Sequence, residues 1–170
     1  MNEFYSETLT EWRGVAQRED ELFGFPACLG LTVLFYNKDM FDAAGLPYPD
    51  TSWTYDELVR VGRQLTVDVD GDGVPGQWGL CFDVHYTGLE TVIYSFGGRT
   101  LSDDAKRAIL NEPATLRGFH FVQDIFLKHR IASYTTSYVS PWESFVGRRA
   151  AMTLIGSLGS MNLEGSTIRW

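Results

Sequence analysis

The chain has 170 residues, of which 44% are hydrophobic and 21% charged, and 14 Lys+Arg against 22 Asp+Glu give a formal net charge of −8. This composition is typical of a globular domain and excludes disorder or a collagen-like repeat for most of the length. The negative charge repels phosphate backbones and disfavours a nucleic acid partner. The longest apolar runs are too short to cross a bilayer, so we expect no membrane-spanning segment.

The N-terminal residues 1–21 are polar and weakly helical, and we expect them to precede an α/β domain over residues 22–170. Residues 31–36 are β-branched and aromatic with little polar alternation, which predicts a strand buried on both faces. A second strand is predicted over 78–82, and a third over 150–155.

Helix signals lie between the predicted strands. Residues 54–57 have the sequence of a capping box, which predicts the start of a helix. Four apolar residues share one face of the next helix, which a Gly pair at 97–98 should end. These four residues are Leu89, Val92, Ile93 and Phe96.

Two further helix starts are predicted near the C-terminal half. Asn111 should cap a helix that has Pro113 in its first turn. Residues 140–143 form a second capping box, and the Gly/Ser-rich residues 156–160 should turn into a final helix. The inward face of the helix after Pro113 is expected to consist of Leu116, Phe119, Val122 and Phe126.

The alternation of strands and helices predicts an α/β fold with a mainly parallel sheet. Ligands of such sheets bind beyond the carboxyl ends of the strands. In this chain those ends are residues 36–38, 83–87 and 156–160. The last of them would also present free amides that can hold hydroxyl or anionic oxygens.

An acidic, Gly-rich loop lies between the first long helix and the second strand. Asp68, Asp70 and Asp72, followed by Gly73, match the first ligand positions and the turn glycine of an EF-hand-type loop. Gly79, however, stands where a bidentate Glu is usual. The loop is therefore either a structural calcium site or a solvated acidic turn.

The histidines and cysteines leave alternatives open. His85 and Tyr86 follow a strand, so His85 could hydrogen-bond a ligand or face water. His120 and His129 are too far apart along a predicted helix to share one metal. Cys28 and Cys81 are either two buried thiols or a disulfide.

Paired carboxylates of a glycoside hydrolase are a second hypothesis. Asp83, Glu90 and Glu143 lie near predicted element ends, but nothing places two of them at hydrolase separation. The sequence contains no nucleophile elbow, phosphate loop or dinucleotide fingerprint.

Six stretches in register resemble extracellular solute-binding proteins of ABC importers, family 1, the maltose-binding-protein-like sugar-binding type. The first three are LFYNKDMF at 34–41, AGLP at 44–47 and SWTYDEL at 52–58. The others are the acidic loop with QWG at 77–79, FGG at 96–98 and FVGRRAAMT at 145–153.

This resemblance implies a three-layer, type II periplasmic-binding lobe, incomplete and covering most of the second lobe. It implies a non-catalytic protein that binds a solute, foremost a carbohydrate, for an ABC transporter permease outside the cytoplasmic membrane. No cofactor is required, with calcium as the one candidate. The alternative is a glycoside hydrolase or a calcium-dependent binding or sensor module.

The ligand-binding residues implied are Asp83, His85 and Tyr86 after the second strand, and Ser157 and Leu158 after the third. Leu158 stands where the family has a sugar-stacking Trp, which bears on the sugar class. A single lobe offers half the contacts, so we expect solute binding to be weak or absent. It also exposes apolar surface, so we expect self-association.

Overall fold

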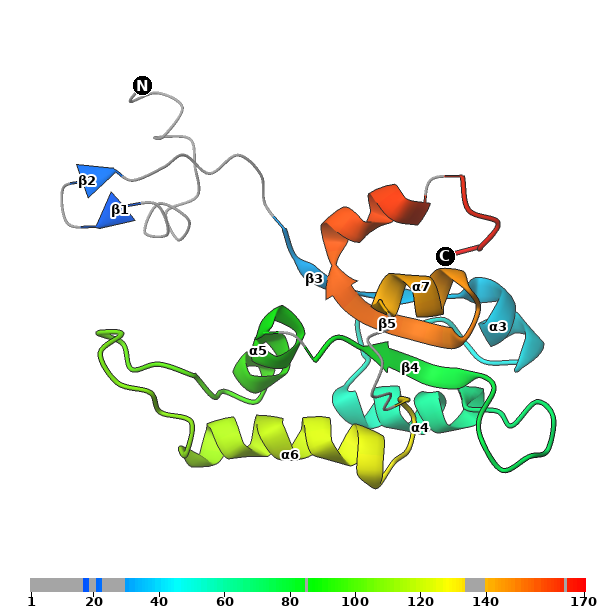
Figure 1. Ribbon diagram of the computed structural model, residues 1–170, viewed down its shortest axis with the longest axis horizontal. Helices are drawn as coiled ribbons and strands as arrows, with labels where there is room; N and C mark the ends of the chain where they lie inside the picture. The colour runs from blue at the N-terminus through cyan, green and yellow to red at the C-terminus, as the bar shows by residue number, and fades with distance from the viewer. Residues whose placement is uncertain (1–16, 19–20, 23–29, 85, 134–139, 164) are drawn as a thin grey trace. The chain divides into compact units, whose positions relative to one another are not determined.

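The computed structural model describes residues 17–18, 21–22, 30–84, 86–133, 140–163 and 165–170 (Figure 1). The chain divides into two units, residues 1–31 and 32–170. In the first unit, β1 (Gln17–Arg18) pairs antiparallel with β2 (Glu21–Leu22). At these four residues the N-terminal segment is therefore extended rather than helical. The rest of residues 1–21 lies outside the described residues.

The second unit contains a three-stranded sheet in the order β3-β5-β4. Its strands are β3 (Thr32–Tyr36), β4 (Trp78–Phe82) and β5 (Ala150–Gly156). Strand β4 runs parallel to β5, whereas β3 runs antiparallel to it. The α/β class is confirmed, but the sheet is mixed rather than mainly parallel. A strand covered on both faces has the same apolar pattern in either direction, so the pattern could not reveal the direction of β3.

The direction of β3 moves one predicted ligand segment. Thr32 pairs with Gly156 and Tyr36 with Met152, so β3 begins at the edge where β5 ends. Residues 36–38 therefore lie at the opposite edge, where the Asn37 amide donates to the Ala151 carbonyl. The prediction that residues 36–38 share the ligand edge is wrong.

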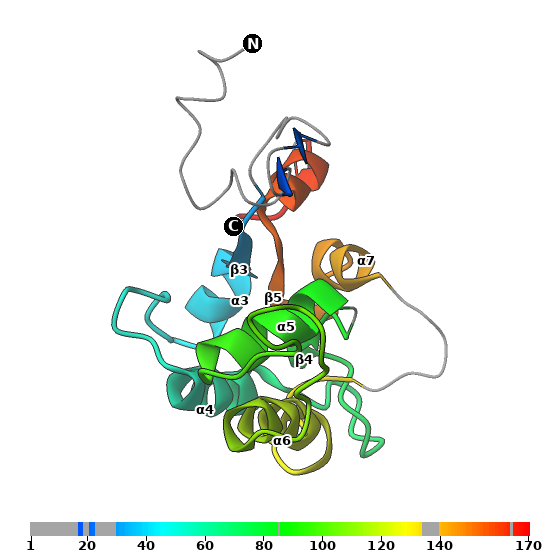
Figure 2. The same ribbon diagram turned by 90° about the vertical axis from the view of Figure 1, so that its left-hand side faces the viewer.

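Helices cover both faces of this sheet, as expected for three layers (Figures 1 and 2). Leu34 and Leu154 pack in the core that α4 (Tyr55–Leu65) and α6 (Pro113–Leu127) share. Phe35 and Ile155 pack on the other face with residues of α7 (Pro141–Val146) and the 3₁₀ helix η1 (Ser157–Leu163). Successive residues of each strand thus enter opposite cores, as the period of a strand requires. The short helix α3 (Lys38–Ala43) follows β3 directly.

Of the three predicted helix caps, the first is confirmed. The Thr54 hydroxyl accepts a hydrogen bond from the Glu57 amide at 3.3 Å, but the reciprocal half of the capping box is wrong, because the Glu57 carboxylate pairs with Arg60 instead of reaching back to the cap. The predicted Asn111 cap is wrong by one residue, because Glu112 is the N-cap of α6. Ser140 is the N-cap of α7 but makes no side-chain capping bond, so the second capping box does not form. Both helices have Pro in the first turn, which fixes the start of a helix without a side-chain cap.

Helix α5 (Tyr86–Ser95) ends as predicted, because Gly97 has a φ of +75° and the Gly98 amide donates to the Ile93 carbonyl. The predicted inward face of α6 is only partly correct. Val122 and Phe126 pack on the core, but Leu116 is 40% exposed and Gly118 is buried instead. A Cβ at Gly118 would lie 2.7 Å from the Ile93 Cα. Since α5 and α6 approach this closely, a small residue occupies the contact, which an apolar pattern does not reveal.

Among the helices that the structure describes, none combines the length and the apolar character that a bilayer crossing needs.

Candidate functional site

The candidate ligand edge is the edge of the sheet at which β4 and β5 both end. Phe82 pairs with Leu154 in this parallel ladder, so the residues that follow the two strands emerge side by side. Asp83 follows β4, and Ser157 and Leu158 open η1 after β5. The topology therefore brings these three predicted ligand-binding residues to one edge, where an open α/β sheet binds ligands.

The side chains at this edge differ in exposure. Asp83 and Ser157 are half-buried, whereas Leu158 is 54% exposed. His85 lies outside the described residues, and Tyr86 is the first residue of α5. The edge thus combines a carboxylate, a hydroxyl and an exposed aliphatic side chain.

Helix α5 is held closely over the end of β4. A Cβ at Gly88 would lie 2.2 Å from the Asp83 carbonyl oxygen, so only glycine allows this approach. One turn further on, the Thr91 hydroxyl donates to the Thr32 hydroxyl at the start of β3, at 3.1 Å. These two contacts fix the backbone around Asp83 relative to the sheet.

The η1 turn is held by a different close contact. A Cβ at Gly159 would lie 1.5 Å from Cζ2 of Trp142, which means that the indole ring occupies the space beside this glycine. Trp142 itself packs edge-on against Phe35, with ring centroids 5.1 Å apart. While Gly159 is buried in this contact, Leu158 and Met161 of the same turn are exposed. Because side chains three residues apart eclipse in a 3₁₀ helix, these two form one aliphatic surface.

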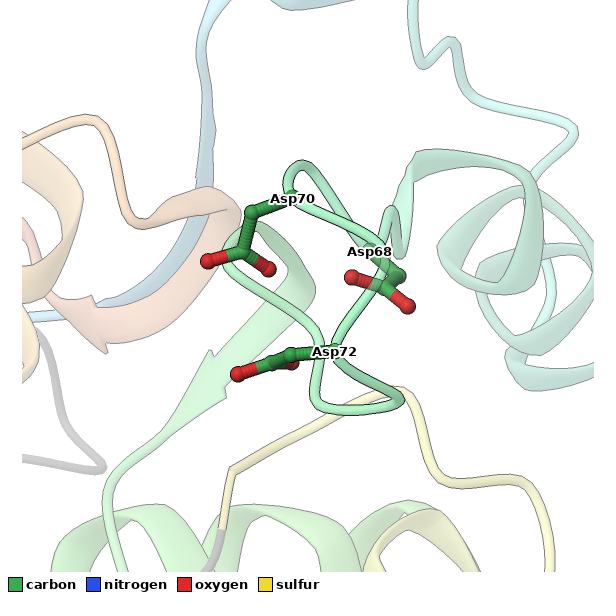
Figure 3. A group of neighbouring side chains, drawn as sticks. All are labelled: Asp68, Asp70 and Asp72. Atoms are coloured by element: carbon green, nitrogen blue, oxygen red, sulfur yellow. The ribbon is translucent and has the colours of Figure 1, made fainter.

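The acidic loop brings its three aspartates together, as Figure 3 shows. Asp68, Asp70 and Asp72 each offer an oxygen within 4.8 Å of the others. The Asp68 carboxylate accepts hydrogen bonds from the Gly73 and Gly71 amides at 2.9 and 2.8 Å. These bonds, with that from Gly73 the largest, lower the pKa of Asp68 and keep it ionised at neutral pH. Calcium binding by the loop stays a prediction.

The acids predicted for the hydrolase hypothesis belong to different parts of the unit. Glu90 of α5 accepts a hydrogen bond from the Thr100 hydroxyl at 2.9 Å. Glu143 is exposed on α7, which packs on the other face of the sheet from α4 and α6. Only Asp83 of the three follows a strand at the candidate ligand edge.

Cysteine and histidine add no reactive group to this edge within the described residues. Cys81 is a free thiol whose pKa is raised by burial, so it is protonated at neutral pH; Cys28 lies outside the described residues. His129 lies beyond α6, with its Nδ1 2.7 Å from the Arg63 guanidinium. Burial, followed by the charge of Arg63, lowers the pKa of His129. The imidazole ring is in contact with Arg63 rather than with the candidate ligand edge.

Three residues that position the site were missed at the level of sequence: Gly88, Trp142 and Gly159. Gly159 was visible only as part of a Gly/Ser-rich turn. Gly88 stands within a helical pattern, where an isolated glycine often marks a close packing contact. In the sequence Trp142 belongs to a capping-box pattern, and nothing in the spacing links it to a turn that follows it by seventeen residues.

The α/β fold, with a carboxylate, a hydroxyl and an exposed aliphatic side chain at one edge of the sheet, is compatible with many functions, and comparisons with known proteins specify the family. A family model described as bacterial extracellular solute-binding protein matches residues 7–163. The chain therefore belongs to the bacterial extracellular solute-binding proteins. A sequence search of curated proteins gives no match.

Solved structures of such proteins share the fold. The ABC substrate-binding protein Lmo0181 from Listeria monocytogenes, solved in complex with cycloalternan, is 20% identical with a TM-score of 0.85, over 98% of this chain and 42% of that chain. The maltose/maltodextrin-binding domain MalE from Bdellovibrio bacteriovorus, bound to maltotriose, is 27% identical with a TM-score of 0.64, over 81% of this chain and 35% of that chain. The maltotriose-binding protein of Thermus thermophilus is 16% identical with a TM-score of 0.72, over 99% of this chain and 43% of that chain. The chain thus spans less than half the length of these proteins.

Proposed function

We propose that the chain supplies one side of the solute site of an ABC transporter's substrate-binding protein, and that the solute is a sugar or oligosaccharide. The observation that carries this proposal is the convergence of Asp83, Ser157 and Leu158 at one sheet edge. The 27% identity to a MalE domain bound to maltotriose supports the same solute class. Family membership over residues 7–163 supports the role in transport.

The chemistry of the edge fits a neutral, hydroxyl-rich solute. A carboxylate accepts hydrogen bonds from sugar hydroxyls, and a serine hydroxyl both donates and accepts them. The aliphatic surface of Leu158 and Met161 offers apolar contact to the C–H face of a ring, without the quadrupole of an aromatic stack. The net charge of −8 disfavours an anionic solute.

Binding without catalysis is part of this proposal. The Cys81 thiol is protonated, and Glu90 is hydrogen-bonded to Thr100 away from the edge. The protein would act outside the cytoplasmic membrane and pass its solute to a permease. The hydrogen bonds and the apolar contact proposed at this edge need no cofactor.

The test is a titration of the ¹⁵N-labelled chain with maltotriose, followed by NMR. We expect shifts at the amides of Asp83, Ser157 and Leu158, and weaker binding by Leu158→Ala. Leu127→Ala is the matched control, because Leu127 is an exposed leucine at the end of α6, 69% accessible. Shifts scattered over the surface, or equal effects of both variants, would contradict the proposal.

Two further measurements use the same sample. The maltotriose should be recovered uncut after incubation, and release of maltose or glucose would favour the hydrolase alternative. Light scattering should show self-association that increases with concentration, and a monomer at every concentration would refute that expectation.

A further inference from the structure

A groove of about 810 Å³ lies between α5 and the segment that follows it, and its residues belong to none of the predicted site groups except Glu90. This segment extends from α5 and returns to α6 (Figure 1). The groove has the size of a small-molecule site. Its lining comprises Glu90, Tyr94, residues 97–100, Leu101, Ser102 and Asp103.

The segment is held firmly on the α5 side. Thr115, which is fully buried, accepts a hydrogen bond from the Arg99 amide at 3.0 Å and donates one to the Arg99 carbonyl at 2.7 Å. A Cβ at Gly98 would lie 2.6 Å from the Thr115 Cα, so the backbone there lies directly on α6. Further out, the Ile109 amide donates to the Thr100 carbonyl. The groove therefore has a fixed wall.

The groups in the groove suit a neutral, hydroxyl-rich ligand. The Tyr94 side chain is 51% exposed and offers a flat apolar face with a polar tip. Glu90 is oriented by the Thr100 hydroxyl at 2.9 Å, and Arg99 pairs with Asp103. With two carboxylates and one guanidinium, the groove has an excess of negative charge, which disfavours phosphate or carboxylate ligands.

Helix geometry connects the groove to the candidate ligand edge. Tyr86, Glu90 and Tyr94 follow one another at intervals of four residues, so the three positions lie along one face of α5. Tyr86 begins the helix at the edge, and Tyr94 lies about 12 Å further along the axis. A chain of linked rings that starts at the edge could therefore continue along this face.

We propose that this groove is a second saccharide subsite, in which Tyr94 packs against one ring and Glu90 accepts hydrogen bonds from its hydroxyls. The inference rests on the proposed function, because a solute at the sheet edge is what brings the neighbouring ring to Tyr94. The groove would then select saccharides of more than one ring over single sugars.

The test compares glucose, maltose and maltotriose as probes of the ¹⁵N-labelled chain. Maltotriose should shift the amides of Glu90, Tyr94 and Thr100 in addition to those of the edge. Tyr94→Ala should weaken maltotriose binding by about tenfold while glucose binding is unchanged. Glu90→Gln, which keeps an acceptor for Thr100 and removes the charge, should weaken maltotriose binding less.

Tyr48→Ala is the control, since Tyr48 is an exposed tyrosine of the same unit that lines no part of the groove. Thermal midpoints of all variants show whether each one folds. If maltotriose shifts only residues 83–88 and 157–160, and Tyr94→Ala and Glu90→Gln bind it as the unchanged chain does, the groove is not a subsite and the proposed function stands. If none of the three sugars shifts any amide, the proposed function fails and the subsite with it.

Discussion

The two edges of the sheet are held in different ways. At the edge where β4 and β5 begin, charges cross between distant parts of the chain, because Asp39 of α3 pairs with both Arg148 and Arg169. At the edge where these strands end, the contacts are steric: Gly88 lies on the Asp83 carbonyl and Gly159 lies on the Trp142 ring. The first kind of contact tolerates adjustment of long side chains, whereas the second does not.

This difference assigns stability mainly to one edge and solute contact to the other. The edge with Asp39, Arg148 and Arg169, which we call the charged edge, fastens the C-terminal residues, since the Arg169 carbonyl also accepts a hydrogen bond from the Lys38 amide. The edge with Gly88 and Gly159, which we call the steric edge, leaves Leu158 and Met161 exposed while it fixes the backbone beneath them. Variants at the steric edge should therefore alter binding and stability together. Variants at the charged edge should alter stability alone.

The largest effect is expected for Gly159→Ala. The new methyl group would overlap the Trp142 ring, and overpacking of this kind costs about 2 kcal/mol of unfolding free energy. Urea unfolding measures this loss, and the maltotriose titration should show weaker binding as η1 moves.

A double variant distinguishes a specific contact from general damage. Trp142→Leu removes the ring atoms that Gly159→Ala would strike, so the two substitutions together should be less destabilising than the sum of the separate effects. Gly156→Ala is the matched control, because a Cβ there meets nothing within 4 Å. Strict additivity of the Gly159 and Trp142 variants would rule out the contact as the reason for glycine at 159.

A smaller effect is expected from calcium at the acidic loop. Calcium at about five times a millimolar dissociation constant would add about 1 kcal/mol to the free energy of unfolding. Thermal unfolding with and without CaCl₂ measures this, and Asp70→Asn, which keeps an oxygen ligand but removes one of the three charges, should reduce the increase. Magnesium is the control ion, because it prefers a more rigid octahedral geometry. An equal response in Asp70→Asn and the unchanged chain would assign the effect to general ionic strength.

The elements and the grouping of the edge residues were predictable from sequence because they depend on local patterns. The apolar runs at 31–36 and 78–82 and the Gly pair at 97–98 each act through neighbouring residues. The direction of β3 and the inward face of α6 were not predictable. The first depends on where the chain enters the sheet, and the second on a backbone approach at Gly118 that apolar periodicity does not encode. The groove beside Tyr94 depends on Thr115, which contacts Arg99 across sixteen residues.

After the calcium effect, the next largest loss of stability is expected for Asp39→Asn at the charged edge. One carboxylate serves two arginines there, so its loss should cost up to about 1 kcal/mol at low salt, with solute binding unchanged. Asp124→Asn, which breaks the pair with Lys128, the C-cap residue of α6, is the control and should cost less. Urea unfolding at low and high ionic strength measures both, because salt screens exposed pairs. A loss that persists unchanged at high salt would show that Asp39 acts through packing rather than charge.

The smallest effect concerns pH at the same edge. The Tyr48 hydroxyl donates to Asp42 at 2.6 Å, and this bond, with a further one from Arg169, lowers the pKa of Asp42. A carboxyl whose pKa is lowered by folding stabilises the native state above its ordinary pKa, and this contribution is lost as pH falls through the folded value. Conversely, the bond to Asp42 raises the pKa of Tyr48, so its contribution is lost as pH rises through that value.

Tyr48→Phe should therefore make the free energy of unfolding less dependent on pH in both the acid and the alkaline range, because both dependences arise from the same hydrogen bond. Urea midpoints over an acid and an alkaline series measure the change. Tyr55→Phe is the matched control, since the Tyr55 hydroxyl donates to the Ser95 hydroxyl rather than to a carboxylate. If Tyr48→Phe reduced the pH dependence only in the alkaline range, Arg169 alone would account for the lowered pKa of Asp42. The arginines alone would then stabilise the carboxylates of the charged edge, and the Tyr48 hydroxyl would contribute nothing.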